Sequence, residues 1–275
     1  MSFFEVLFGR KLRSDEQESE RIGPFAAVPV LGLDALASAA YGPEAALTVL
    51  IPLAAAAAGV IAPITLMIVA LLLVVAISYE QTLRAYPNGG GSFTVAKENL
   101  GRTAALLAAS ALCVDYVLNV AVAISAGVGA IASVEPRLLP HTLPLCLGVL
   151  ALLTVVNLRG VRESGLVFLL PTYLFVACLF TTIGIGAWKL FATHGHPAPL
   201  AAASGPRLSQ GVQMAGFWMI ARAFASGCTA LTGVEAVSNA VPIFRPPTVR
   251  NARRTLTIIV AVLVALLLGI AMVSR

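Results

Sequence analysis

Apolar residues fill most of the chain in long runs that are separated by short polar segments. A helix of about 20 apolar residues is long enough to span the hydrocarbon core of a bilayer. The runs predict seven spans, at about 25–57, 60–83, 103–133, 141–158, 164–191, 214–242 and 255–274. We therefore expect an all-α membrane protein that crosses the bilayer several times.

Composition and charge agree with this pattern. The chain is 59% hydrophobic and 11% charged, with a mean hydropathy of +0.91, more apolar than a soluble domain of this size. The polar segment 1–22 lacks the apolar core of a signal peptide, so we interpret it as a cytoplasmic N-terminal arm and 23–275 as the transmembrane domain. With the N-terminus inside, thirteen of the 18 basic residues fall in inner segments. This distribution predicts a cytoplasmic N-terminus in the cell membrane and explains the net charge of +5 without a nucleic-acid partner.

Two of the predicted spans contain glycine and hydroxyl residues at mid-depth. The first span carries them at Ser38–Glu44 and the sixth around Ala225–Asn239. Interrupted spans at corresponding positions indicate an inverted-repeat transporter, with a first five-span repeat at about 25–191 and a second beginning at about 214–275. An unwound segment is tolerated at that depth only where it lines a cavity or binds something. We therefore expect both helices to be broken there and to form a binding site.

Acidic residues inside the predicted spans point to the ligand class. Asp34, Asp115 and Glu235 lie in spans one, three and six, where a carboxylate costs several kcal/mol unless it is paired, protonated or coordinating. A bound cation or protons would supply the missing positive charge. Hydroxyl and amide oxygens that suit a hard cation lie nearby in the sequence, on Ser38, Tyr41, Tyr116, Asn119, Ser125, Thr229 and Thr232.

Other chemistry finds little support in the sequence. The segment "NGGGS" at Asn88–Ser92 matches neither the P-loop nor the GxGxxG pattern, so we interpret it as a flexible hinge between spans. Catalytic triads, HExxH and Walker motifs do not occur. We therefore expect no enzymatic activity and no cofactor.

Five segments together resemble the APC superfamily, and within it the KimA-like branch of the KUP potassium importers. They are "DALASAAYGPE" (34–44), "AYPNGGGSFTVAKENLG" (85–101), "DYVLNVAVAISAG" (115–127), "NLRGVRESG" (157–165) and "ALTGVEAVSNAVPIF" (230–244). The resemblance implies a LeuT-type fold and proton-coupled potassium uptake. The potassium site that it implies consists of Asp34, Tyr41, Asp115, Tyr116, Thr232 and Glu235, with Ser38, Gly42, Asn119, Ser125 and Gly233 as supporting positions. Glu235 and Asp115 are the candidates for the coupling proton, because burial favours the neutral form of a carboxyl group.

The chain departs from that family pattern in two respects. In span three, Ala123 and Asn119 stand where serine and threonine are expected, so Asn119 or Ser125 would replace a hydroxyl ligand. A LeuT-type fold needs ten spans, whereas the chain ends at Arg275 after the seventh. We therefore expect a truncated chain, one that pairs with a missing C-terminal half or forms a homodimer, and that does not transport alone.

Three functional interpretations remain open: a potassium importer, an amino acid permease working by cation or proton symport, and a non-transporting fragment or partner subunit. Asp34 and Glu235 favour potassium over amino acids, because they would repel a substrate carboxylate. A cationic or protonated substrate escapes this objection.

Overall fold

The computed structural model describes residues 21–51, 57–158, 161–193 and 217–274. The secondary structure in these ranges is helical, apart from one isolated bridge between Ile22 and Phe244. The expectation of an all-α protein is therefore confirmed for the described residues. The predicted N-terminal arm lies almost entirely outside them.

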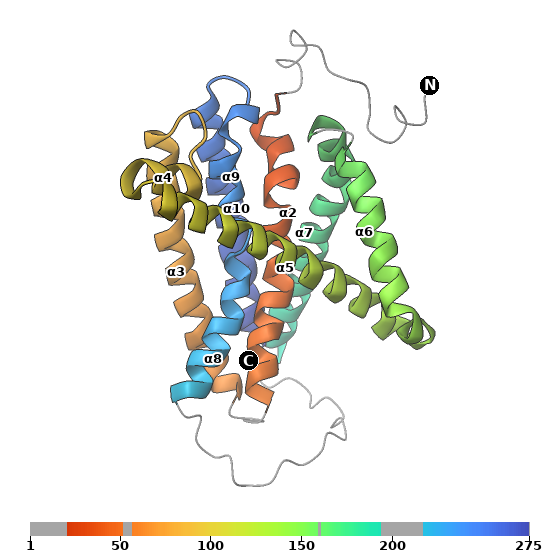
Figure 1. The fold of residues 1–275 in the computed structure, drawn as a ribbon. Helices are drawn as coiled ribbons and strands as arrows, with labels where there is room; N and C mark the ends of the chain where they lie inside the picture. Colours follow the sequence, from red (N-terminus) through yellow and green to blue (C-terminus); the bar gives the residue numbers. More distant parts are fainter. Residues whose placement is uncertain (1–20, 52–56, 159–160, 194–216, 275) are drawn as a thin grey trace, which may run out of the picture. The chain divides into compact units, whose positions relative to one another are not determined.

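Long apolar helices make up most of the structure (Figure 1). Among the described residues, five segments are long and apolar enough to cross a membrane. They are α3 (Ala57–Ala85), α5 (Arg102–Val134), α6 (Thr142–Leu158) with the preceding η2 (Pro136–His141), α7 (Val161–Ala192) and α10 (Thr248–Val273). Helix α2 (Pro24–Leu50) gives a sixth if its two bent halves are counted as one span.

The predicted break in the first span is wrong in its position. Helix α2 continues through Ser38–Glu44, and its bend of 48° lies between Leu31 and Leu33. Pro29 and Gly32 flank that bend, and sharp kinks usually occur at such residues. Gly42 serves another purpose: a β-carbon on it would lie 2.7 Å from the β-carbon of Ala230. This glycine therefore permits close packing and does not unwind the helix.

The sixth predicted span is interrupted, as expected. Helix α8 (Phe217–Gly227) continues into η3 (Cys228–Leu231), and the chain then leaves helical geometry at Thr232, with ψ 149°, and at Gly233, with φ +80°. Two short elements follow, α9 (Ala236–Asn239) and η4 (Val241–Ile243). A positive φ is accessible to glycine at little cost, which explains why the helix ends there.

The contacts divide the chain into two compact units. Unit 1 comprises Met1–Asp34, Ile77–Thr172 and Gly233–Ile258, and unit 2 comprises Ala35–Ala76, Tyr173–Thr232 and Ile259–Arg275. The candidate site residues are split between them. Unit 1 contains Asp34, Asp115, Tyr116, Asn119, Ser125, Gly233 and Glu235, and unit 2 contains Ser38, Tyr41, Gly42 and Thr232.

Small residues bring the helices of unit 2 together. A β-carbon on Gly186 of α7 would lie 2.6 Å from Val273, and one on Gly269 of α10 would lie 2.7 Å from Ile183. Glycines at such contacts let membrane helices approach closely, where dispersion forces drive association.

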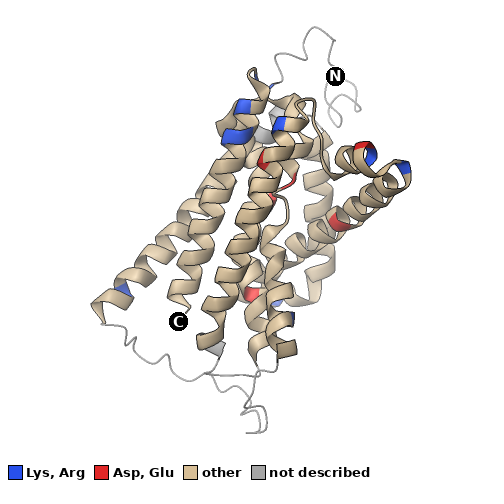
Figure 2. Cartoon of the chain, turned by 90° about the vertical axis from the view of Figure 1, so that its left-hand side faces the viewer, with Lys and Arg blue, Asp and Glu red and all other residues tan. Residues whose placement is uncertain are grey.

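Polar contacts hold the termini of several elements in unit 1. The Ile22 amide donates to the Ile243 carbonyl at 2.9 Å, and the Arg245 amide donates to the Ile22 carbonyl at 3.0 Å. Glu80 of α3 accepts hydrogen bonds from Arg84 and from Arg253 of α10. The basic residues of α10 lie in its N-terminal part. Figure 2 shows the Lys and Arg residues, in blue, mostly toward the ends of helices.

Candidate functional site

Glu235 is the most deeply buried acidic residue of the described chain. It follows the interruption at Thr232 and Gly233, and only 8% of its surface is exposed. Its Oε1 atom is buried and has no hydrogen-bond partner among the described residues. Asp115 and Asp34 lie within electrostatic range of its carboxyl group. Unit 1 thus brings together all three acids that the sequence singled out.

Asp34 is held by a residue of α5. The Asn119 amide group donates a hydrogen bond to Asp34 Oδ2, and both side chains are partly buried. Asn119 lies one helical turn after Asp115, so the two side chains project from the same face of α5. Asn119, which departs from the family pattern in span three, therefore bonds Asp34, one of the candidate acids.

Tyr116 connects α5 to the turn that carries Glu235. Its hydroxyl group accepts a hydrogen bond of 3.1 Å from the Asn239 amide, and it lies close to the Glu235 carboxyl group. Tyr79, near the C-terminal end of α3, also lies within range of the charges on Glu235 and Asp115. Sequence reasoning missed Asn239 and Tyr79, because nothing in their local pattern distinguishes them from ordinary polar residues in a span.

The glycine segment after α3 packs against the turn that contains Asn239, and its role as a flexible hinge stays a prediction. Gly90 and Gly91 are buried, and the Gly90 amide donates to the Ser238 carbonyl at 3.2 Å. A β-carbon on Gly91 would lie 1.4 Å from Asn239 Oδ1. The sequence did not reveal this packing, because close packing and flexibility both favour glycine.

Unit 2 contains the remaining candidate ligands. The hydroxyl group of Ser38 lies 2.7 Å from the Ala35 carbonyl and 3.0 Å from the Ala230 carbonyl, so it ties α2 to η3. The Thr232 hydroxyl donates to the Thr229 carbonyl at 2.9 Å. Tyr41 is half-buried. This bond uses the Thr232 hydroxyl proton, so the lone pairs of the hydroxyl oxygen are not engaged by it.

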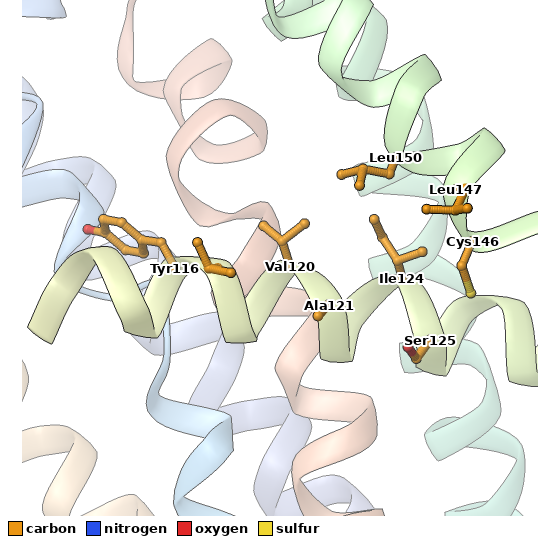
Figure 3. Close-up of a pocket in the computed structure, with 9 residues that line it drawn as sticks. Tyr116, Val120, Ala121, Ile124, Ser125, Cys146, Leu147 and Leu150 are labelled. Atoms are coloured by element: carbon orange, nitrogen blue, oxygen red, sulfur yellow. The ribbon is translucent and has the colours of Figure 1, made fainter. Parts of the chain in front are cut away.

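Ser125 lies apart from the acids, in an apolar cavity of about 530 Å³ between α5 and α6 (Figure 3). Tyr116, Ile124, Cys146 and Leu150 are among its lining residues. Ten residues separate Ser125 from Asp115 on α5, which corresponds to about 15 Å along the helix axis. The cavity has no charged lining residue and does not suit a cation.

The chemistry of the carboxylate cluster in unit 1 suits a monovalent cation. No group of three His, Cys, Asp or Glu side chains among the described residues could jointly hold a metal ion. Weakly hydrated monovalent cations are coordinated mainly by neutral oxygens and need no such group; the neutral oxygen that lies close to the Glu235 carboxyl group is the Tyr116 phenol.

Comparisons with known proteins agree with the membrane character of the fold. The family model described as "Amino acid permease" matches residues 35–274. The chain is 40% identical over 276 residues to the potassium transporter KimA of Bacillus subtilis (strain 168), an alignment that covers 99% of this chain and 44% of that protein. The chain thus spans less than half the length of the curated relative it matches. The extent of the family match shows that the chain belongs to the amino acid permease family of membrane transporters.

Proposed function

We propose that the chain serves in potassium transport and that Glu235, with Asp34 and Asp115, provides the negative charge of a potassium site. The buried Glu235 carboxyl group carries this proposal, because its Oε1 atom has no hydrogen-bond partner among the described residues. A buried carboxylate with one oxygen unpaired is unfavourable, and a bound cation would offset that cost.

Two further observations support potassium as the cation. The relative with 40% identity is named a potassium transporter, and the oxygens near Glu235 include the neutral phenol of Tyr116. Potassium is coordinated readily by neutral oxygens in place of its hydration shell. The family resemblance also implies Tyr41 and the Thr232 carbonyl as ligands, and both residues belong to unit 2.

Proton coupling would use the same acids. A carboxyl group that is buried favours its neutral form until a cation arrives. Potassium binding would therefore release a proton from Glu235, which is buried, and protonation would release potassium. Asp115, the other candidate that the family resemblance implies, is exposed, so the burial argument does not extend to it. The N-terminus and the basic beginning of α10 would lie on the cytoplasmic side, in agreement with the distribution of arginine along the chain.

Amino acid transport is the second candidate function, because the matching family model is described as an amino acid permease. A substrate carboxylate would be repelled by Asp34 and Glu235 unless these acids were protonated. A cationic amino acid would avoid this repulsion.

Thermal stability of the purified chain in potassium-free sodium buffer distinguishes the candidates. A ligand at about a hundred times its dissociation constant stabilises the folded state by about 2.7 kcal/mol. We expect potassium to raise the unfolding temperature and Asp34→Asn to abolish the rise. Glu44→Gln is the matched control, because Glu44 lies on the same helix and is exposed. A rise with an amino acid and none with potassium would refute the potassium assignment.

Proton release gives a second test. Potassium added to the protein in weakly buffered solution should acidify the medium, as recorded by a pH indicator. We expect Glu235→Gln or Asp115→Asn to remove the signal. Potassium binding with no proton release in the unmodified chain would refute the coupling proposal while leaving the site intact.

A further inference from the structure

We infer that Asn239 is a positioning residue that directs the hydroxyl group of Tyr116 toward Glu235, and that the Gly89–Gly91 segment holds Asn239 in place. This inference rests on the proposed potassium site and adds two elements to it. The first is Asn239, whose side chain would not contact the ion. The second is the Gly89–Gly91 segment, which sets the orientation of that side chain.

Asn239 and Glu235 belong to one short turn. They are four residues apart, so their side chains project from the same face. The turn is held by its own hydrogen bonds. The Glu235 backbone carbonyl accepts from the Ser238 backbone amide at 2.9 Å, from the Ser238 hydroxyl at 2.8 Å and from the Asn239 backbone amide at 3.3 Å. Both side chains therefore reach Tyr116 from a rigid backbone.

The polarity of the bond to Tyr116 decides where the phenol proton points. The side-chain nitrogen of Asn239 can only donate, so Tyr116 Oη is the acceptor in the 3.1 Å bond. The phenol proton is then not used in this bond and is available to another acceptor. The nearby Glu235 carboxyl group is an acceptor when it is ionised.

The glycine segment explains why Asn239 adopts this orientation. Asn239 Oδ1 occupies the space where a β-carbon on Gly91 would lie, at 1.4 Å, and Asn239 Cγ would be 2.6 Å from it. The side-chain oxygen thus faces Gly91 while the nitrogen faces Tyr116. Gly89 has φ +90°, and the Gly90 amide bonds the Ser238 carbonyl, so the backbone follows the turn closely.

The consequence for the proposed site is indirect. A phenol proton directed at Glu235 favours the ionised carboxylate, which is the form that would bind potassium. Loss of the Asn239 donor frees the phenol to rotate, and potassium affinity falls although no ligand has been removed.

The test is a double-mutant cycle on potassium affinity, measured by thermal stability in the full chain. Asn239→Leu keeps the size of the side chain and removes the donor, and we expect it to lower affinity about fivefold, the worth of one hydrogen bond. In a Tyr116→Phe background the same substitution should have no further effect. Additive effects of the two substitutions would overturn the inference, because Asn239 would then not act through Tyr116.

Gly91→Ala tests the loop without altering either polar side chain. Its β-carbon should displace the Asn239 side chain and reproduce the loss seen with Asn239→Leu, again only when Tyr116 is present. Gly129→Ala on α5 is the matched control, because its β-carbon meets nothing within 4 Å. Unchanged potassium affinity in a folded Gly91→Ala protein would overturn the role of the loop.

A separate readout distinguishes failure of this inference from failure of the proposed function. If potassium does not stabilise the unmodified chain, the potassium site is refuted. The same cycle, measured as unfolding temperature in potassium-free buffer, then decides the positioning role alone. Coupling between Asn239 and Tyr116 would support it, and additive changes would overturn it.

Discussion

Gly42 lies where α2 packs against Ala230 of η3 in unit 2, and replacing it with alanine adds a single methyl group to that contact. The new β-carbon would lie 2.7 Å from the Ala230 β-carbon, 3.0 Å from its backbone nitrogen and 3.1 Å from its α-carbon. Ordinary contacts of a β-carbon are 3.4–4 Å. Two of the three opposing atoms belong to the backbone, so no rotation of a side chain relieves the clash.

The magnitude follows from three effects. Overpacking of a well-packed site costs about 1–3 kcal/mol. Separation of α2 from η3 also weakens the bond from Ser38 to the Ala230 carbonyl, worth about 1 kcal/mol. Alanine in a helix is favoured over glycine by about 1 kcal/mol, which offsets part of the loss. We expect Gly42→Ala to lower the free energy of unfolding by about 1–3 kcal/mol.

The assay is thermal unfolding of the detergent-purified protein, with Gly127→Ala as the control. Gly127 is also helical, and a β-carbon on it meets nothing within 4 Å. The control should therefore be as stable as the unmodified chain, or more stable by up to about 1 kcal/mol. Equal stability of the two alanine variants would refute the interpretation of Gly42 as a packing residue.

Three other substitutions give smaller or more selective effects. Arg253→Leu leaves Glu80 with Arg84 as its partner, and the Arg253 and Glu80 side chains are 39% and 38% exposed. Because water screens such a pair, we expect the free energy of unfolding to fall by about 1 kcal/mol or less. In thermal unfolding this difference should be smaller at high salt. Ser38→Ala should cost about 1 kcal/mol in the same assay, since the buried hydroxyl group is shared between two backbone carbonyls; no change would mean that these bonds contribute nothing net. Ser125→Ala should leave potassium-dependent stabilisation unchanged, because this side chain lines an apolar cavity. A loss of potassium response in that variant would place Ser125 in the ion site.

The sequence predicted correctly those features that depend on burial in an apolar medium. Long apolar runs identified the helices, and the glycine and hydroxyl residues around Ala225–Asn239 identified an interrupted one. Acids that are expensive in such a medium were recognisable as unusual, and Asp34 and Asp115 both lie within electrostatic range of Glu235 in unit 1. Their role in binding stays a prediction.

Features that depend on contacts between distant segments were not predictable in this way. Gly42 and Gly91 carry no local sign of whether they unwind a helix, provide flexibility or make room for a neighbour. Their partners, Ala230 and Asn239, lie more than 140 positions away in the sequence. A separation of 123 positions likewise concealed the bond from Asn239 to Tyr116.

The bridge between Ile22 and Phe244 also constrains the order of events during biosynthesis. The Arg245 guanidinium, which bonds the Arg21 carbonyl beside the bridge, is 224 positions from that partner. At about 5–20 residues per second of synthesis, the N-terminal segment waits about 10–45 s before its partner is made. Only 5% of Ile22 is exposed in the folded protein. Its contact with Phe244 therefore cannot form while most of the chain is still being translated. The bridge closes only after the sixth predicted span has been synthesised.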